Sequence, residues 1–209
     1  MKNKVYNIYK NLYLKHGDNP ASVKARTSKQ QEMRFKHLID CAEIISGDSI
    51  LDVGSGLGNF LTYIRKKKLH CHYTGIDFYQ NFINISKRKY FKDKNSKFIN
   101  FDICNKKINK KYDWVVLSGT FNDKHKNSKS EMLKILKKMF KASKKGIIFN
   151  SLSKYVDFED KSLFYSYPDK IFNFCVKNLS KYVVLKTDYQ LKKGVLPFEY
   201  TMCVKKNDN

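Results

Sequence analysis

A short aliphatic strand leads directly into a glycine-rich turn at residues 51–60, LDVGSGLGNF. Gly54, Gly56 and Gly58 alternate there with other residues before a helical pattern resumes. Glycines at this spacing let the backbone turn tightly and approach a ligand closely. The stretch therefore predicts a strand, a ligand-binding turn and a helix, in that order.

From residue 48 onward, short β-rich apolar runs alternate with longer amphipathic segments, which indicates a parallel sheet covered by helices. Only a loop fits between residues 189 and 199, so the last two strands should pair as an antiparallel hairpin. The predicted fold class is α/β: a Rossmann-like mixed sheet of about seven strands, the last one antiparallel, with helices on both faces. The predicted strands are Asp48–Val53, His72–Asp77, Lys97–Phe101, Tyr112–Ser118, Gly146–Ser151, Tyr182–Asp188 and Tyr200–Lys205, and the predicted helices are Asn59–Lys67, Gln80–Phe91, Ser128–Lys141 and Pro168–Leu179.

The residues before this core are predicted to form a helical cap, 1–46. Ser28 to Ser46 has the periodicity of a helix that ends at Gly47, and residues 1–27 indicate another helix followed by the loop HGDNP, with a break at Pro20. The chain has 209 residues, 42% of them hydrophobic, which suits one domain with a sizeable core. We expect a single domain over 1–209, with its core at 48–206.

No apolar run approaches the roughly 20 residues of a membrane-spanning helix, and lysines interrupt the apolar residues of the amino terminus. No membrane span is therefore expected, and a cytoplasmic location is predicted. The five cysteines are scattered without the paired spacing of a zinc or redox motif, so they are expected to be thiols in a reducing compartment. No metal site is predicted.

The net charge of +23 would attract any polyanion, so nucleic acid is one candidate partner. Only four of the 42 basic residues are arginine, although arginine is the usual reader of phosphates and bases. The lysines recur as pairs along the chain instead of clustering. These observations favour compositional drift and a small-molecule substrate over a nucleic-acid footprint.

The glycine turn can be compared with the two ligand classes that use such a turn. A dinucleotide site requires G-x-G-x-x-G, but Asn59 occupies the position of the third glycine, so the spacing here is G-x-G-x-G. Asp52 precedes the turn at the carboxyl end of the strand, where a pyrophosphate would have to approach. A carboxylate at this position suits a cationic ligand better.

LDVGSGLGNF resembles motif I of the class I S-adenosylmethionine-dependent methyltransferases, and later elements resemble the following motifs in the same order. The resemblance implies that Asp77, in GIDF, binds the ribose hydroxyls, a role that suits a carboxylate. It implies that Asp102 and Ile103, in NFDI, contact adenine, and that Ser118 and Gly119 lie beside the methionine moiety. S-adenosylmethionine is therefore the expected cofactor, and its expected ligands are Asp52, Gly54, Ser55, Gly56, Gly58, Asp77, Phe78, Asp102, Ile103, Ser118 and Gly119, with Arg34 on the cofactor carboxylate.

A looser resemblance, carried by HGDNP, QQEMRF, SGTFN, IIFNSLS, TDY and FEYT, is to a subgroup of bacterial small-molecule methyltransferases. Many members of that subgroup are associated with making surface polysaccharides or other secondary metabolites. The sequence departs from the subgroup at Ala25, where tryptophan is expected, and at Thr187, where histidine is expected. O-methylation of a sugar, an activated sugar or a related polysaccharide precursor is the predicted reaction.

Methyl transfer to a hydroxyl benefits from a base, and the crevice of such a sheet lies at the carboxyl ends of its strands. His16, oriented by Asp18, and Asp188 are the candidate bases; His125 is a weaker one, because its surroundings indicate an exposed loop. The candidate acceptor ligands are Asp18, Asn122, Asn150, Tyr189 and Glu199. Each of these residues could equally be a strand-end cap or a surface residue.

An RNA methyltransferase is the main alternative, because of the charge. Amino-directed base methyltransferases often carry N/D-P-P-Y/F/W after the fourth strand, where this chain has SGTF, although ribose- and carbon-directed enzymes do not need that motif. An inactive scaffold is a third possibility, against which the intact cofactor motifs argue. The acceptor atom and the oligomeric state stay open.

Overall fold

The computed structural model describes residues 2–23, 27–191 and 198–207. Its helices are α1 (Lys2–His16), α2 (Ser28–Ala42), α3 (Asn59–Lys66), α4 (Gln80–Lys89), α5 (Ser128–Ala142) and α6 (Pro168–Asn178), with 3₁₀ turns η1 (Pro20–Val23) and η2 (Thr120–Asn122). Its strands are β1 (Ser49–Val53), β2 (His72–Asp77), β3 (Ser96–Asn100), β4 (Tyr112–Leu117), β5 (Ser143–Ser153), β6 (Tyr165–Ser166), β7 (Val183–Lys186) and β8 (Glu199–Lys205).

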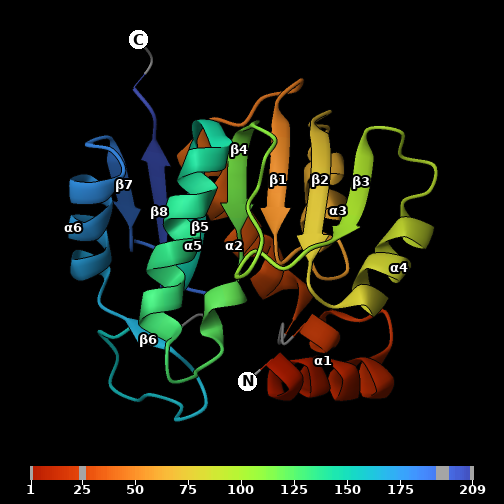
Figure 1. Cartoon of the computed structure of the whole chain (residues 1–209), viewed down its shortest axis with the longest axis horizontal. Coiled ribbons are helices and arrows are strands. Elements are labelled where there is room, and N and C mark those ends of the chain that lie inside the picture. The colour runs from red at the N-terminus through yellow and green to blue at the C-terminus, as the bar shows by residue number, and fades with distance from the viewer. Residues whose placement is uncertain (1, 24–26, 192–197, 208–209) are drawn as a thin grey trace.

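The strands form one mixed sheet in the order β3-β2-β1-β4-β5-β8-β7 (Figure 1). β1 to β5 run parallel, whereas β8 is antiparallel to both β5 and β7, which confirms the predicted hairpin. The two-residue β6 pairs with the end of β5 and was missed, because two residues carry no periodicity. β1 and β4 are parallel neighbours, but the chain continues from them toward opposite sides of the sheet, which leaves a crevice at their carboxyl ends.

Alternating residues of the strands build two cores, one on each face of the sheet. On one face, Leu51 and Val53 of β1 pack in a cluster with apolar residues of α5 and α6. On the other face, Ile50 of β1 packs in a cluster with apolar residues of α2, α3 and α4. The prediction that helices cover both faces of the sheet is therefore confirmed.

The amino-terminal segment lies across the carboxyl edge of the sheet, with α1 below the ends of β1 and β2 (Figure 1). Its tyrosines pack edge to face on the start of α4: Tyr6 against Tyr79, and Tyr9 and Tyr13 against Phe82. The predicted amino-terminal helix is therefore present, and it is α1 that packs at this edge, whereas α2 covers a face of the sheet.

Several predicted boundaries were wrong by a few residues. α2 ends at Ala42, where Glu43 takes the left-handed conformation (φ 53°), so Gly47 is not its cap. β5 begins at Ser143 instead of Gly146, because its first residues pair with the start of β4. Part of the predicted loop between β7 and β8 (192–197) and the end of the predicted polar tail (208–209) lie outside the described residues.

Candidate functional site

The glycine turn after β1 is held by the neighbouring strand. The backbone N–H groups of Gly54 and Ser55 both donate to the carbonyl of Ile76 in β2. Gly58 has φ +74°, and a Cβ there would lie 2.6 Å from the Tyr90 ring and 3.0 Å from Phe98. Only glycine combines this dihedral with this packing, so the turn is fixed by β2, by β3 and by the residue that follows α4.

Asp52, at the end of β1, is 3% exposed and accepts a hydrogen bond from the hydroxyl of Tyr73. Burial raises the pKa of Asp52 to about 7, although the Tyr73 hydrogen bond acts in the opposite direction. The pKa of a buried carboxyl group rises when no nearby cation compensates for the hydration that its charged form loses. The site is therefore suited to a positively charged ligand group.

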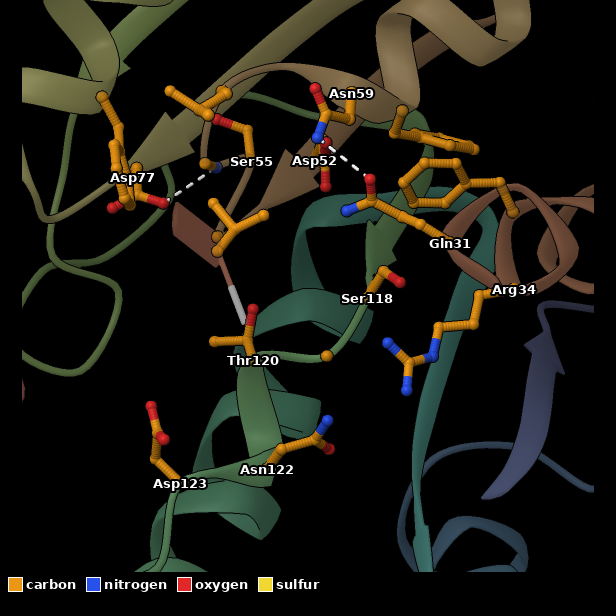
Figure 2. A pocket seen from close by; sticks show the side chains of 18 of the residues that line it. Gln31, Arg34, Asp52, Ser55, Asn59, Asp77, Ser118, Thr120, Asn122 and Asp123 are labelled. Carbon is orange, nitrogen blue, oxygen red and sulfur yellow. Dashed lines mark hydrogen bonds between the residues drawn. The ribbon is translucent and has the colours of Figure 1, made fainter. Parts of the chain in front are cut away.

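Asp77, at the end of the adjacent strand β2, is 7% exposed. One oxygen accepts from the backbone N–H of Gly56 at 2.9 Å (Figure 2), and the other accepts from the backbone N–H of Tyr79 at 2.8 Å. Burial raises the pKa of Asp77 to about 6, and these backbone hydrogen bonds limit the rise. The two donors fix the orientation of the carboxylate while each oxygen retains capacity for a further donor.

Two cavities meet at this edge of the sheet, with volumes of about 310 and 390 Å³. Asp52, Ser55, Arg34 and Asn122 line the first cavity, whereas Asp102 and Ile103 line the second. The residues common to both cavities are Tyr9, Gly54, Asp77, Phe78, Thr120 and Asp123. One elongated ligand can therefore run from the first cavity to the second past Asp77.

The lining fits S-adenosylmethionine by its polar groups. Ser55 Oγ and Asn122 Oδ1 are buried without a hydrogen-bond partner among the described residues, and both residues line the first cavity. Such orphaned polar atoms are rare unless a ligand or water satisfies them. The second cavity has apolar walls, including Phe78, Phe101 and Ile103, which suit a flat heterocycle.

Arg34 enters the first cavity from α2, and Figure 2 shows its guanidinium directed into the space. Its Nε donates to Glu199 Oε2 at 2.7 Å, and the Glu199 side chain is only 1% exposed. Glu199 does not itself line either cavity, as the described residues define them. Glu199 therefore orients Arg34. Its position does not bring the Glu199 side chain into contact with a ligand in either cavity.

Some predicted acceptor-side residues lie away from both cavities. His16 ends α1, and Asp18 pairs with Lys89 on α4. Asp188, with a side chain that is 74% exposed, pairs with Lys186. Among the described residues, neither cavity lining includes these side chains. The structure therefore keeps His16 and Asp188 away from the cavities, whereas His125, the weaker candidate base, lines the second cavity, where its Nε2 lies 3.3 Å from Glu131 Oε2.

Two further predicted residues have structural partners. The hydroxyl of the buried Tyr189 is hydrogen-bonded to Thr201, and its ring stacks on His37. Asn150 is 1% exposed, accepts from the backbone N–H of Gly119 and donates to Ser118 Oγ. Asn150 thereby positions the loop after β4 from behind.

Sequence reasoning missed many residues that line the first cavity, including four that form two hydrogen-bonded side-chain pairs. Gln31 accepts at 2.9 Å from Asn59, which had been considered only as a departure from the dinucleotide pattern (Figure 2). Tyr9 donates its hydroxyl to Asp123 Oδ2 at 3.1 Å. These pairs join segments that are 28 and 114 residues apart, so no local pattern identifies them.

Solved structures resemble this chain closely in fold. Magnesium protoporphyrin IX methyltransferase from Synechocystis, with bound S-adenosylhomocysteine, has a TM-score of 0.65 at 12% identity over 98% of this chain and 95% of its own. A phosphoethanolamine N-methyltransferase of Haemonchus contortus, in complex with phosphomonomethylethanolamine and S-adenosylhomocysteine, has a TM-score of 0.61 at 14% identity over 75% of this chain and 38% of its own. The fold is that of the class I S-adenosylmethionine-dependent methyltransferases.

Sequence comparisons give one family match and one related protein. The family model described as "Methyltransferase domain" matches residues 44–184. The "Putative methyltransferase Rv1506c" of Mycobacterium tuberculosis is 31% identical over 164 residues, which cover 76% of this chain and 93% of the relative. The chain belongs to the methyltransferase-domain family, and the expectation of an S-adenosylmethionine-dependent enzyme is confirmed.

Proposed function

We propose that this methyltransferase transfers the methyl group to a hydroxyl of a small polar molecule, a sugar, an activated sugar or a related polysaccharide precursor. The observation that carries the proposal is the lining of the first cavity, which combines two buried carboxylates with several neutral amides and one arginine. The carboxylates, Asp52 and Asp77, suit the cofactor. The amides of Gln30, Gln31 and Asn122 suit an uncharged, hydroxyl-rich acceptor.

The cofactor roles follow the shape of the two cavities. Asp77 would accept from the ribose hydroxyls, because its orientation is fixed by two backbone donors. Asp52 would lie near the ammonium group of the cofactor's methionine part. Arg34 would hold the cofactor carboxylate with the guanidinium edge that Glu199 leaves open. The proposed adenine contacts are Phe78, Asp102 and Ile103, and those of the methionine part are Gly54, Ser55, Gly56, Ser118 and Gly119. Gly58, which was also predicted as a cofactor ligand, is not among the described residues that line either cavity and packs against Tyr90 and Phe98.

The bound cofactor supplies an electrophilic methyl group on a sulfonium. Transfer is an in-line displacement, so the chain contributes chiefly by positioning and by excluding water. The cap does both, since Val23 of η1 and Tyr9 of α1 line the first cavity together with the glycine turn. Leu152, Leu163 and Phe198 give the acceptor end an apolar wall, which suits the C–H face of a sugar ring.

The size of the cavities supports a small acceptor. A space of about 310 Å³ that also receives part of the cofactor leaves room for one small ring. The coclaurine N-methyltransferase bound to N-methylheliamine and the Haemonchus enzyme named above are relatives in fold whose ligands are likewise small molecules. Among the described residues no helix is long and apolar enough to cross a membrane.

The proposal includes a cytoplasmic location. The cysteines of the described chain are free, and Cys71, Cys175 and Cys203 are buried as thiols. Buried thiols without disulfides are typical of proteins in reducing compartments. Localisation of a tagged chain by fractionation tests this part, and recovery from an oxidising compartment would contradict it.

Methyl transfer from radiolabelled S-adenosylmethionine tests the acceptor class. A desalted extract of the source organism lacking this gene is labelled by the purified protein, and products are separated by size before and after nuclease. Label in small molecules or in nuclease-resistant glycan is the expected result. Label in a nuclease-sensitive polymer would overturn the proposal and make the +23 charge functional. An Asp77→Asn variant serves as the control for cofactor-dependent transfer.

A further inference from the structure

A polar bridge crosses the place where the two cavities meet. Tyr9, on the cap helix α1, donates its hydroxyl to Asp123 Oδ2 at 3.1 Å, and Asp123 directly follows η2 at the end of β4. Both residues line both cavities. The bridge therefore lies over the narrow part of any ligand that occupies the two spaces at once.

The Tyr9 side of the bridge is held by aromatic packing. Its ring lies edge to face on Phe82 and Phe78, with centroids 5.8 and 6.3 Å away. Burial, reinforced by the charge of Asp123, raises the pKa of Tyr9 well above its usual value. The phenol thus stays protonated and remains a hydrogen-bond donor at neutral pH.

The Asp123 side is held by its own loop. The backbone carbonyl of Asp123 accepts from Ser128 Oγ, and Asp123 forms an isolated antiparallel bridge with Leu163. Its carboxylate and that of Asp77 lie on either side of Thr120 (Figure 2). A fixed carboxylate at this place adds negative charge to the narrow part of the ligand path.

Acidic residues outnumber basic ones among the described residues that line the first cavity. Asp52, Asp77 and Asp123 line it, whereas Arg34 is the one lysine or arginine among the described lining residues. Arg34 is paired with the buried Glu199. A positive charge on a ligand is therefore favoured in this cavity, and loss of that charge removes the attraction.

We infer that Tyr9 and Asp123 close over the cofactor where it passes between the cavities, and that Asp123 makes the site prefer the cationic sulfonium to the neutral thioether product. In the transfer, a C–S bond breaks, a bond from the acceptor oxygen to the methyl carbon forms, the acceptor hydroxyl releases its proton to solvent, and the sulfonium becomes an uncharged thioether. The charge that Asp123 attracts disappears in that step. The bridge thus holds the substrate form and favours release of the product form. This inference rests on the proposed cofactor site and does not depend on the acceptor.

Calorimetric titration with three ligands tests it without any methyl acceptor. S-adenosylmethionine and sinefungin, whose amine is protonated at neutral pH, are cationic at the position in question, whereas S-adenosylhomocysteine is neutral there. Asp123→Asn should weaken the two cationic ligands about tenfold and the neutral one less than about twofold. Tyr9→Phe should weaken all three about threefold and speed their dissociation in stopped-flow measurements.

Matched variants separate the bridge from general disturbance. Tyr13→Phe changes another α1 tyrosine that packs on Phe82, at 6.3 Å, and Asp188→Asn removes a carboxylate outside both cavities. Both should bind all three ligands like the wild type. Asp123→Glu keeps the charge, so it should keep the preference for cationic ligands, and it supplies the test if Asp123→Asn fails to fold.

Equal weakening of all three ligands by Asp123→Asn, or no weakening, would overturn the charge preference. Unchanged affinity and dissociation in Tyr9→Phe would overturn the closing role. A wild type that binds the three ligands but labels no small molecule would overturn the proposed acceptor and leave this inference standing. A wild type that binds none of them would overturn both.

Discussion

The two walls of the ligand cavity are built in different ways. The wall formed by the ends of β1 and β2 comes from adjacent strands, and its carboxylates, Asp52 and Asp77, follow from the register that pairs Asp52 with Gly75 and Val53 with Ile76. The opposite wall is assembled from the cap, η2 and the residues near β8, which meet through side chains such as Arg34 with Glu199. The first wall is set by backbone and the second by long-range side-chain pairs.

This difference determines how freely the residues of each wall can be substituted. Strand ends are positioned by a sheet that is buried on both faces, so a change there disturbs the core as well as the site. The cap and the loops can change without altering the sheet, which is where acceptor specificity resides in such folds. In the proposed assignment, the backbone-built wall supplies the carboxylates that bind the cofactor, whereas the side-chain-built wall supplies Arg34 at the cofactor carboxylate and the contacts to the acceptor.

The largest expected effect is on the glycine turn. Gly58→Ala should lower the free energy of unfolding by about 4 kcal/mol, because a left-handed dihedral and contact with Tyr90 and Phe98 are both unfavourable. Gly47→Ala is the matched control: it has φ +93° but nothing within 4 Å of the added Cβ, so about 1 kcal/mol is expected. Denaturant titration measures both. Equal losses would show that packing behind the turn does not matter.

The second largest effect should be on the Arg34–Glu199 pair. Arg34→Ala leaves Glu199, whose side chain is 1% exposed, without its cation, so a loss of about 3 kcal/mol in stability is expected. It should also weaken S-adenosylhomocysteine binding. Lys36→Ala removes an exposed ion pair with Asp40 on the same helix and should cost less than about 0.5 kcal/mol. Unchanged ligand affinity in Arg34→Ala would remove its cofactor role.

A third effect concerns pH. Burial raises the pKa of Asp52 to about 7 and that of Asp77 to about 6, and a cationic ligand favours their charged forms. Affinity for S-adenosylmethionine should therefore rise about tenfold between about pH 5.5 and pH 7.5, with release of protons on binding. Titration in buffers of different ionisation enthalpy measures this release. Asp52→Asn should flatten the profile, and an unflattened profile would assign the proton elsewhere.

The same two groups affect the stability of the ligand-free protein with the opposite sign. Because the folded state holds their protons more tightly than the unfolded chain does, their contribution is full below the unfolded pKa of 3.8 and is lost as pH rises through about 6 to 7. A bound cationic ligand offsets this loss. The gain in melting temperature on adding sinefungin should thus increase with pH across that window, and a constant gain would contradict the prediction.

The smallest effects are expected at the residues that lie outside the cavities. His16→Ala and Asp188→Asn should change the affinity for S-adenosylhomocysteine by less than about twofold, because neither side chain is among the described residues that line a cavity. Calorimetric titration measures this affinity. A loss of tenfold or more in either variant would mean that the segment moves onto the ligand.

The backbone-built wall could be predicted from the sequence better than the side-chain-built wall. The sheet, its antiparallel last strand and the positions of Asp52 and Asp77 were predictable, because strand ends and positive-φ glycines leave local patterns. The partners of Tyr9 and Arg34 were not, since they are 114 and 165 residues away in the chain. His16 and Asp188 were chosen for residue type and strand proximity, which do not show whether a side chain reaches a cavity. β6 has too few residues to give a pattern.

A crystal structure of the protein in complex with S-adenosylhomocysteine tests most directly the claim that the cofactor occupies both cavities and passes Asp77. We expect the ribose hydroxyls on Asp77, the adenine between the apolar walls at Phe78 and Ile103, and the amino-acid end in the first cavity beside Asp52. A ligand bound elsewhere, or one whose ribose does not contact Asp77, would contradict the assignment of the two walls.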